Sequence, residues 1–191
     1  MSQSKSSARL KKKTILVCLS GSIALYRSCD LIRALKREGA DCYCLMTKSA
    51  QQFVTSLTFQ ALSGHQVYTD QFSTEQDWAV LHTQLADQAD LILVSPASAN
   101  IIARLANGMA DDLVASVILA SKSKVLITPA MNDNMFSHPI TQENIRKLKQ
   151  IGYQFTDPIE GDLVCGRVGV GHIADQSVIL NKIVSILSSK R

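Results

Sequence analysis

The stretch from Leu91 to Asp112, LILVSPASANIIARLANGMADD, decides the fold. Its first four residues form an unbroken apolar run, which is typical of a parallel strand covered by helices on both faces. Pro96 cannot extend the hydrogen-bond ladder, so we expect the strand to end near it. Ser98 and Asn100 then stand where a helix begins, and Asn107-Gly108 is a left-handed stop that ends this helix.

The same stretch also predicts a ligand site. Ligands of open α/β sheets bind beyond the carboxyl ends of the strands, which is where Ser98 and Asn100 stand. Helix capping is the commonest use of such residues, and it weighs against the position beyond a strand end that favours a ligand. This stretch alone therefore supports capping and ligand binding about equally. The predicted helix turns an apolar face inward, made of Ile101, Ile102, Leu105 and Met109.

Strands and helices alternate along the rest of the chain. Further strands are predicted at 14–19, 41–46, 124–128 and about 153–155, and helices at about 23–38, 51–62, 78–89, 112–120, 141–151 and 177–187. This order predicts a single-domain α/β fold, a doubly wound parallel sheet of five or six strands with helices on both faces. The helix at 112–120 is more apolar than a surface helix needs, which suggests that it faces another subunit.

Length and composition limit the class of protein. The chain has 191 residues, 46% of them hydrophobic, which suits one domain with a full core. No apolar run reaches the ~18 residues of a membrane span, and no signal peptide is visible, so we expect a soluble cytoplasmic protein. Five of the positive charges behind the net charge of +4 lie in residues 1–13, which contain no acid. This predicts a disordered basic leader at 1–13, a domain at 14–191 and no nucleic-acid-binding surface.

The five cysteines show neither metal-ligand spacing nor a paired framework, so we expect reduced thiols and no metal site. Cys18, Cys42 and Cys44 fall within predicted strands and are most simply core residues. Cys165 differs, because it lies in a glycine-rich stretch at about 160–175 that has no helical or strand period. We interpret this stretch as a mobile lid.

Two more polar loops follow predicted strands. Ser20-Gly21-Ser22 connects the first strand to a helix, a context in which backbone N–H groups bind anions, although an ordinary tight turn is the alternative. The turn lacks G-x-G-x-x-G, and the second strand runs into Thr47-Lys48-Ser49 without an acidic residue, so a monophosphate fits better than a pyrophosphate. After the strand at 124–128, Asn132 offers an amide suited to holding a carboxylate. His82 precedes the strand that begins at Leu91. A lone histidine has a structural role more often than a functional one.

Four motifs in this order resemble the flavin-dependent cysteine decarboxylases, and most closely those of coenzyme A synthesis. They are SGSIALY at 20–26, PASAN at 96–100 with LANGMADDL at 105–113, PAMNDNM at 129–135 and CGRVGVG at 165–171. The resemblance implies a Rossmann-like, flavodoxin-like subunit that assembles as a trimer or a multiple of three and holds FMN between subunits. It implies FMN contacts for Ser20, Gly21, Ser22, Thr47, Ser49, Ser98 and Asn100.

The resemblance also implies a reaction. His82 would be the active-site histidine, Asn132 would hold the substrate carboxylate beside Met135, and Cys165 would be the acid of the lid. The implied reaction converts 4'-phosphopantothenoylcysteine to 4'-phosphopantetheine through thioaldehyde and enethiolate intermediates, with FMN accepting and returning the electrons. A peptidyl-cysteine oxidative decarboxylase and a flavin-binding regulatory subunit are the alternatives. The chain departs from the family pattern at Ile101, Phe136, Arg167 and His172, which affects packing and the lid.

Overall fold

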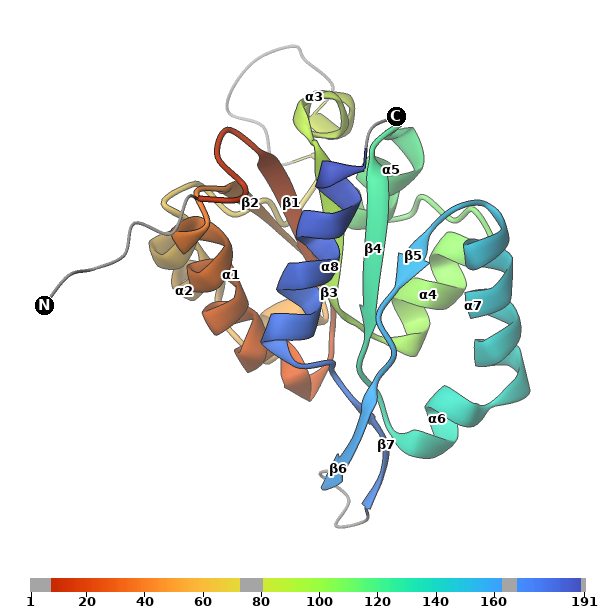
Figure 1. Ribbon diagram of the computed structural model, residues 1–191. Coiled ribbons are helices and arrows are strands. Elements are labelled where there is room, and N and C mark those ends of the chain that lie inside the picture. The colour runs from red at the N-terminus through yellow and green to blue at the C-terminus, as the bar shows by residue number, and fades with distance from the viewer. Residues whose placement is uncertain (1–7, 73–80, 163–167, 190–191) are drawn as a thin grey trace, which may run out of the picture.

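The computed structural model describes residues 8–72, 81–162 and 168–189. Five parallel strands form the central sheet in the order β2-β1-β3-β4-β5 (Figure 1). They are β1 (Thr14–Leu19), β2 (Asp41–Met46), β3 (Leu91–Ala97), β4 (Lys124–Pro129) and β5 (Gln154–Phe155). The strand order reverses between β1 and β3, and in such sheets a crevice opens beyond the carboxyl ends of these strands.

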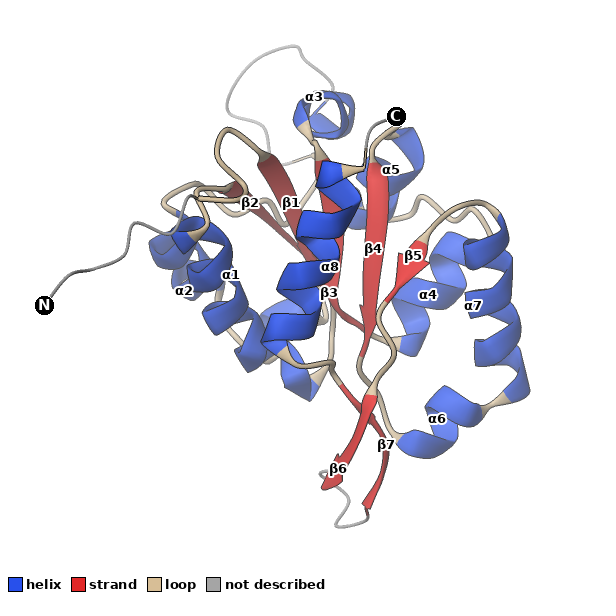
Figure 2. Cartoon of the chain, in the orientation of Figure 1, coloured by secondary structure: helices blue, strands red, loops and turns tan. Residues whose placement is uncertain are grey.

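Helices cover both faces of the sheet (Figure 2). One layer holds α1 (Arg27–Arg37), α2 (Ser56–Ser63) and α8 (Gln176–Ser188), and the other holds α3 (Leu81–Gln88), α4 (Ala99–Ala106), α5 (Leu113–Ala120) and α7 (Pro139–Gln150). Alternate residues of β1 feed the two layers, since Val17 packs in one core and Cys18 in the other. The predicted doubly wound α/β sheet is confirmed.

Local signals fix the helix limits. Ser98 caps α4, its Oγ accepting from the Ile101 N–H at 3.4 Å, and Gly108 adopts the left-handed φ of +67° just after the helix. The predicted helix at 23–38 is divided into a 3-10 helix, η1 (Ile23–Tyr26), and α1. A second 3-10 helix, η2 (Ala50–Gln52), precedes α2. The placement of Met109 on the apolar face of α4 is wrong, because the turn redirects the chain and leaves Met109 exposed.

The apolar helix α5 is a core helix of this chain. Six of its eight residues are buried, and α3 packs against it. Asp112 caps its start, Oδ1 accepting from the Ala115 N–H at 2.8 Å. The apolar sequence of α5 is therefore accounted for within this chain, and the inference that α5 faces another subunit loses its basis.

The segment before β1 is folded from residue 8 onward. Leu10 is buried and donates its N–H to the Glu38 carbonyl at 2.9 Å. Arg9 pairs with Glu38 at 2.8 Å, and this hydrogen bond lowers the pKa of the Glu38 carboxyl. The predicted disordered leader is wrong for residues 8–13, and residues 1–7 lie outside the described ranges.

The three strand cysteines are core residues, as predicted. Cys18, Cys42 and Cys44 are buried, and burial raises the pKa of the Cys42 and Cys44 thiols to about 12. These thiols are therefore protonated and unreactive at neutral pH. In the described part of the chain, no cluster of His, Cys, Asp or Glu is arranged to hold a metal ion. None of the helices there has the length and apolar character of a membrane-spanning segment.

Candidate functional site

A cavity of about 570 Å³ lies at the carboxyl edge of the sheet, where the strand order reverses. The turn after β1, the start of α4 and the loop after β4 form three of its sides. The predicted site residues that line it are Gly21, Ser22, Ser98, Asn132 and Met135. The structure thus brings together residues that lie more than a hundred positions apart in the sequence.

Ser20 holds two of these loops together. Its Oγ donates to the Pro96 carbonyl at 2.7 Å and accepts from the Ser98 N–H at 2.9 Å. Ser22 makes the equivalent link to the third loop, donating to the Ala130 carbonyl at 3.0 Å. Ser20 is only 1% exposed and is not among the described residues that line the cavity, so its hydroxyl shapes the cavity from behind.

Replacing Ser20 with Ala should lower the free energy of unfolding by about 1–3 kcal/mol, because it leaves the buried Pro96 carbonyl and the part-buried Ser98 N–H without this partner. Urea denaturation followed by circular dichroism measures this loss. Ser177→Ala, on the exposed face of α8, is the matched control and should change stability little. Equal stability of the two variants would show that the Ser20 bonds contribute nothing to the fold.

Asn132 is fixed by the helix that it begins, α6 (Asp133–Ser137). Its Oδ1 accepts from the Asn134 N–H at 3.0 Å and from the Met135 N–H at 3.4 Å. The side chain therefore has a defined orientation in the cavity wall.

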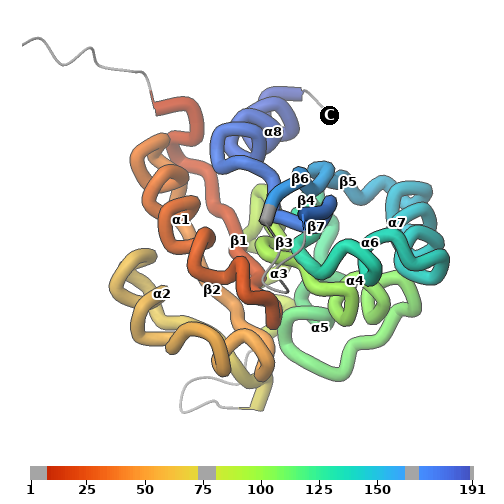
Figure 3. The backbone as a smooth tube through the Cα atoms, turned by 90° about the horizontal axis from the view of Figure 1, so that it is seen from below, coloured from red at the N-terminus to blue at the C-terminus, as the bar shows by residue number. Residues whose placement is uncertain are grey.

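The next wall is formed by β7 (Val168–His172), which pairs antiparallel with β6 (Ile159–Asp162). The sequence predicts no helical or strand period for the glycine-rich stretch at about 160–175. This prediction is wrong on both sides of residues 163–167, where the chain forms strands. The Met131 N–H donates to the Gly171 carbonyl at 3.0 Å, and a Cβ on Gly171 would clash with the Met131 carbonyl oxygen. Figure 3 shows β7 beside α6 at this edge. Cys165 and Arg167 lie outside the described residues, and the mobility of the lid stays a prediction.

Three of the predicted cofactor residues, Thr47, Ser49 and Asn100, line a second, polar hollow of about 670 Å³. The two hollows adjoin at Gly21, where an added Cβ would lie 2.6 Å from the Ser49 Cβ. Thr47 is held in place there, because its Oγ1 accepts from the Ala50 N–H at 3.2 Å.

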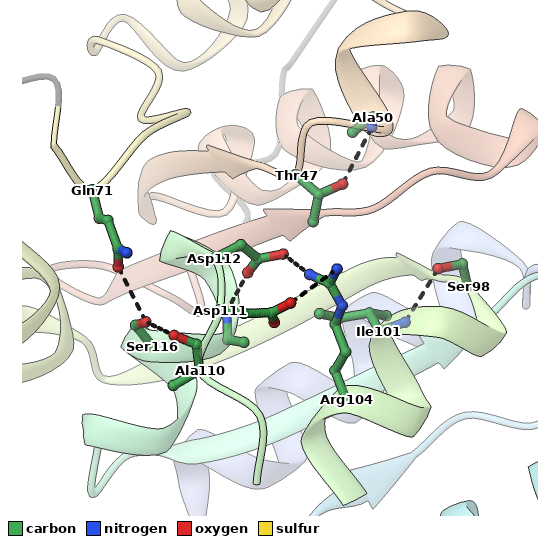
Figure 4. A network of polar contacts seen from close by, with 11 residues as sticks. Thr47, Ala50, Gln71, Ser98, Ile101, Arg104, Ala110, Asp111, Asp112 and Ser116 are labelled. Atoms are coloured by element: carbon green, nitrogen blue, oxygen red, sulfur yellow. Dashed lines mark hydrogen bonds and ion pairs between the residues drawn. The ribbon is translucent and has the colours of Figure 1, made fainter. Parts of the chain in front are cut away.

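An ion-pair cluster forms another wall of this second hollow (Figure 4). Arg104 on α4 contacts Asp112 at 2.6 Å and Asp111 at 3.3 Å. Because Asp112 also caps α5, this cluster joins the start of α5 to α4.

His82 does not join the other predicted residues. It is partly buried on α3, which leads into the amino end of β3, at the top of Figure 1 and away from the edge that carries the cavity. His82 is not among the described residues that line either hollow. One chain alone therefore does not bring His82 to Asn132.

The cavity also contains residues that the sequence did not single out as site residues. Phe53 and Tyr26 add aromatic surface, and Arg27 and His172 add groups that can carry positive charge. Phe53 follows Ser49 by about one helical turn, which is a signal that could have been used. Arg27 resembles any polar residue on the outer face of a helix, so no such signal marks it in the sequence.

A doubly wound sheet with a cavity at its switch point is the arrangement in which open α/β proteins bind their ligands. The profile of the Flavoprotein family matches residues 3–188, so the chain belongs to the Flavoprotein family.

The chain is similar to two curated proteins over most of its own length. It is 47% identical over 171 residues to the coenzyme A biosynthesis bifunctional protein CoaBC of Bacillus subtilis, covering 90% of this chain and 42% of that protein. It is 45% identical over 173 residues to the probable phosphopantothenoylcysteine decarboxylase of Streptococcus mutans, covering 90% of this chain and 97% of that protein. The chain thus spans less than half the length of its bifunctional relatives.

Two solved structures share the whole fold. A mutant PPC decarboxylase complexed with pantothenoylaminoethenethiol has a TM-score of 0.84 and 28% identity, over 94% of this chain and 100% of that one. The FMN binding protein AtHal3 has a TM-score of 0.83 and 29% identity, over 95% of this chain and 100% of that one. The predicted resemblance is therefore confirmed at the level of family and fold.

The residues present fit a flavin. The cavity volume lies within the roughly 300–1,000 Å³ that is usual for small-molecule sites. Its walls combine apolar side chains, among them Ile23, Phe53 and Met131, with a few polar groups, as a planar ring with polar edges requires. At Gly21 the chain packs directly against Ser49, so any larger residue would push into the boundary between the two hollows.

Proposed function

We propose that the chain decarboxylates 4'-phosphopantothenoylcysteine to 4'-phosphopantetheine in coenzyme A synthesis, with FMN as its cofactor. One observation carries the proposal. The cavity holds Ser98, Asn132 and Met135 together in a chain that covers 97% of a relative named as this decarboxylase. The alternatives, a peptidyl-cysteine decarboxylase and a regulatory subunit, have less support, because the relatives with 45–47% identity are named for coenzyme A synthesis or this decarboxylation.

FMN is the flavin that the site favours. The second hollow places the Thr47 and Ser49 side chains beside Gly21, where they suit a single phosphate. The solved relative AtHal3 is described as an FMN binding protein. When bound, FMN supplies an acceptor for the electrons of the substrate thiol, which an unactivated cysteine carboxylate needs before it can lose CO2.

Asn132 is the proposed carboxylate-binding residue. Its Oδ1 accepts from two N–H groups of α6, which turns the NH2 end of the amide away from the helix start. An NH2 group only donates, so it can bind a carboxylate without carrying a charge of its own. The neutral amide leaves the carboxylate electron-rich, as the loss of CO2 requires.

In this proposal, His82 acts in a site that a second copy of the chain completes. It lines neither hollow of its own subunit, so we assign it to the site of a neighbouring subunit, in a homotrimer or a multiple of three. Its imidazole can change protonation near neutral pH and so move a proton at the substrate. Cys165 is the proposed acid that protonates the substrate carbon in the closing half of the reaction. We place the enzyme in the cytoplasm.

The proposal is tested with substrate that carries ¹³C in the cysteine carboxylate. The purified holoenzyme should release labelled CO2, and denaturation should release FMN in stoichiometric amount. Stoichiometric FAD or NAD would contradict the cofactor assignment. Retention of the label in the substrate would contradict the reaction.

A further inference from the structure

Arg27 is a charged group of the cavity to which the proposed reaction gives no role. It is the first residue of α1, and it is partly buried. It lines the cavity together with Tyr26 and Asn132. It also lines a smaller hollow of about 280 Å³ between α1 and the start of α8.

The guanidinium of Arg27 has no carboxylate partner among the residues that the structure describes. Within the ranges that the structure describes, Arg27 forms no ion pair, although Asp30 stands three residues further along α1. Its Nε donates a hydrogen bond to the Tyr26 hydroxyl at 3.4 Å. A partly buried guanidinium without a counter-ion favours an anionic ligand, and its planar fork matches the oxygens of a phosphate.

The surroundings fix where such an anion would lie. Arg27 and Ile173 are shared by the cavity and the smaller hollow, so Arg27 stands at the boundary between them. Beyond this boundary, the smaller hollow is lined by the carboxylates of Asp30 and Asp175, which repel a phosphate. An anionic end of a ligand that extends from the cavity would therefore stop at Arg27.

We propose that Arg27 binds the phosphate of the phosphopantothenoyl substrate and of its product, an inference that rests on the proposed function. Asn132 then holds one end of an elongated substrate and Arg27 holds the other. The phosphate of FMN is assigned to the second hollow, which Thr47 and Ser49 line and Arg27 does not. Arg27 is a specificity residue in this account, because it binds the phosphate and takes no part in the reaction at the cysteine carbon.

The test compares Arg27→Gln with Arg33→Gln, which removes an exposed guanidinium from the same helix outside the cavity. Calorimetry measures the binding of phosphopantetheine and of pantetheine to each holoenzyme. The wild type and Arg33→Gln should bind the phosphorylated compound roughly ten- to a hundredfold more tightly. Arg27→Gln should bind both compounds alike, with its affinity for pantetheine unchanged. Arg27→Lys should keep part of the preference, since it keeps the charge but not the fork.

Several outcomes would overturn the inference. A wild type that binds the two compounds equally would do so, as would an Arg27→Gln variant that keeps the preference. A variant that loses FMN while its preference for the phosphorylated compound persists would show that Arg27 binds the cofactor instead. If the wild type releases CO2 from the substrate and Arg27→Gln keeps the preference, this inference alone fails and the proposed function stands. If no CO2 is released although the preference depends on Arg27, the phosphate site stands and the proposed reaction fails.

Discussion

Asn132→Asp is expected to reduce the rate of decarboxylation by about a thousandfold while leaving the fold intact. Aspartate caps helices as well as asparagine does, so its carboxylate should keep the bonds to the Asn134 and Met135 N–H groups. The variant, however, places a negative charge where the substrate carboxylate must bind. Two like charges about 4 Å apart at an effective dielectric constant of about 20 repel by about 4 kcal/mol, which corresponds to a factor of about a thousand. Steady-state kinetics measures the loss.

Asn134→Asp is the matched control for this prediction. It adds the same charge two residues along the same helix, on an exposed side chain that does not line the cavity. Its activity should stay close to that of the wild type. An Asn132→Asp enzyme with wild-type activity, or equal losses in both variants, would show that Asn132 does not hold the substrate carboxylate.

His82→Asn is expected to reduce decarboxylation by about a hundred- to ten-thousandfold, because Asn cannot exchange a proton near neutral pH. The structure adds a sharper expectation. Since His82 does not line the cavity of its own subunit, His82→Asn and Asn132→Asp should complement each other in mixed oligomers. With equal amounts of both chains in a cyclic oligomer, about a quarter of the sites combine an intact His82 with an intact Asn132.

Co-expression of the two variants with different affinity tags provides the mixed oligomers. Their activity should rise to about a quarter of the wild-type value, whereas each variant alone stays inactive. A chain that carries both substitutions is the control and should stay inactive when expressed alone. Mixed oligomers that are no more active than either variant would place His82 within its own subunit or outside the site.

Much of the fold follows from local sequence signals. The Ser98 cap, the Gly108 stop and the apolar run of β3 each act through neighbours in the sequence, so they could be predicted. The cavity residues Ser98 and Asn132 could be predicted for the same reason, since both follow parallel strands. Pattern alone left their roles open, and the family resemblance gave them a function.

The remainder depends on contacts between distant residues. Ser20 bonds to Pro96 across 76 positions, and nothing in the SGS turn indicates that its hydroxyl is used in this way. The burial of α5 is decided by packing against α3 and the sheet, so its apolar sequence was compatible with two different coverings. Arg27 could not be recognised either, because the absence of a carboxylate partner within the described ranges is a property of the folded surroundings.

The mass of the product formed by the wild-type holoenzyme, with no external reductant present, tests the central claim most directly. The account predicts phosphopantetheine, which is lighter than the substrate by one CO2 and nothing more, because the electrons taken from the thiol are returned within the same cycle. A product lighter by a further two hydrogens would identify an oxidative decarboxylase of the peptidyl-cysteine kind. Unchanged substrate would contradict the account altogether.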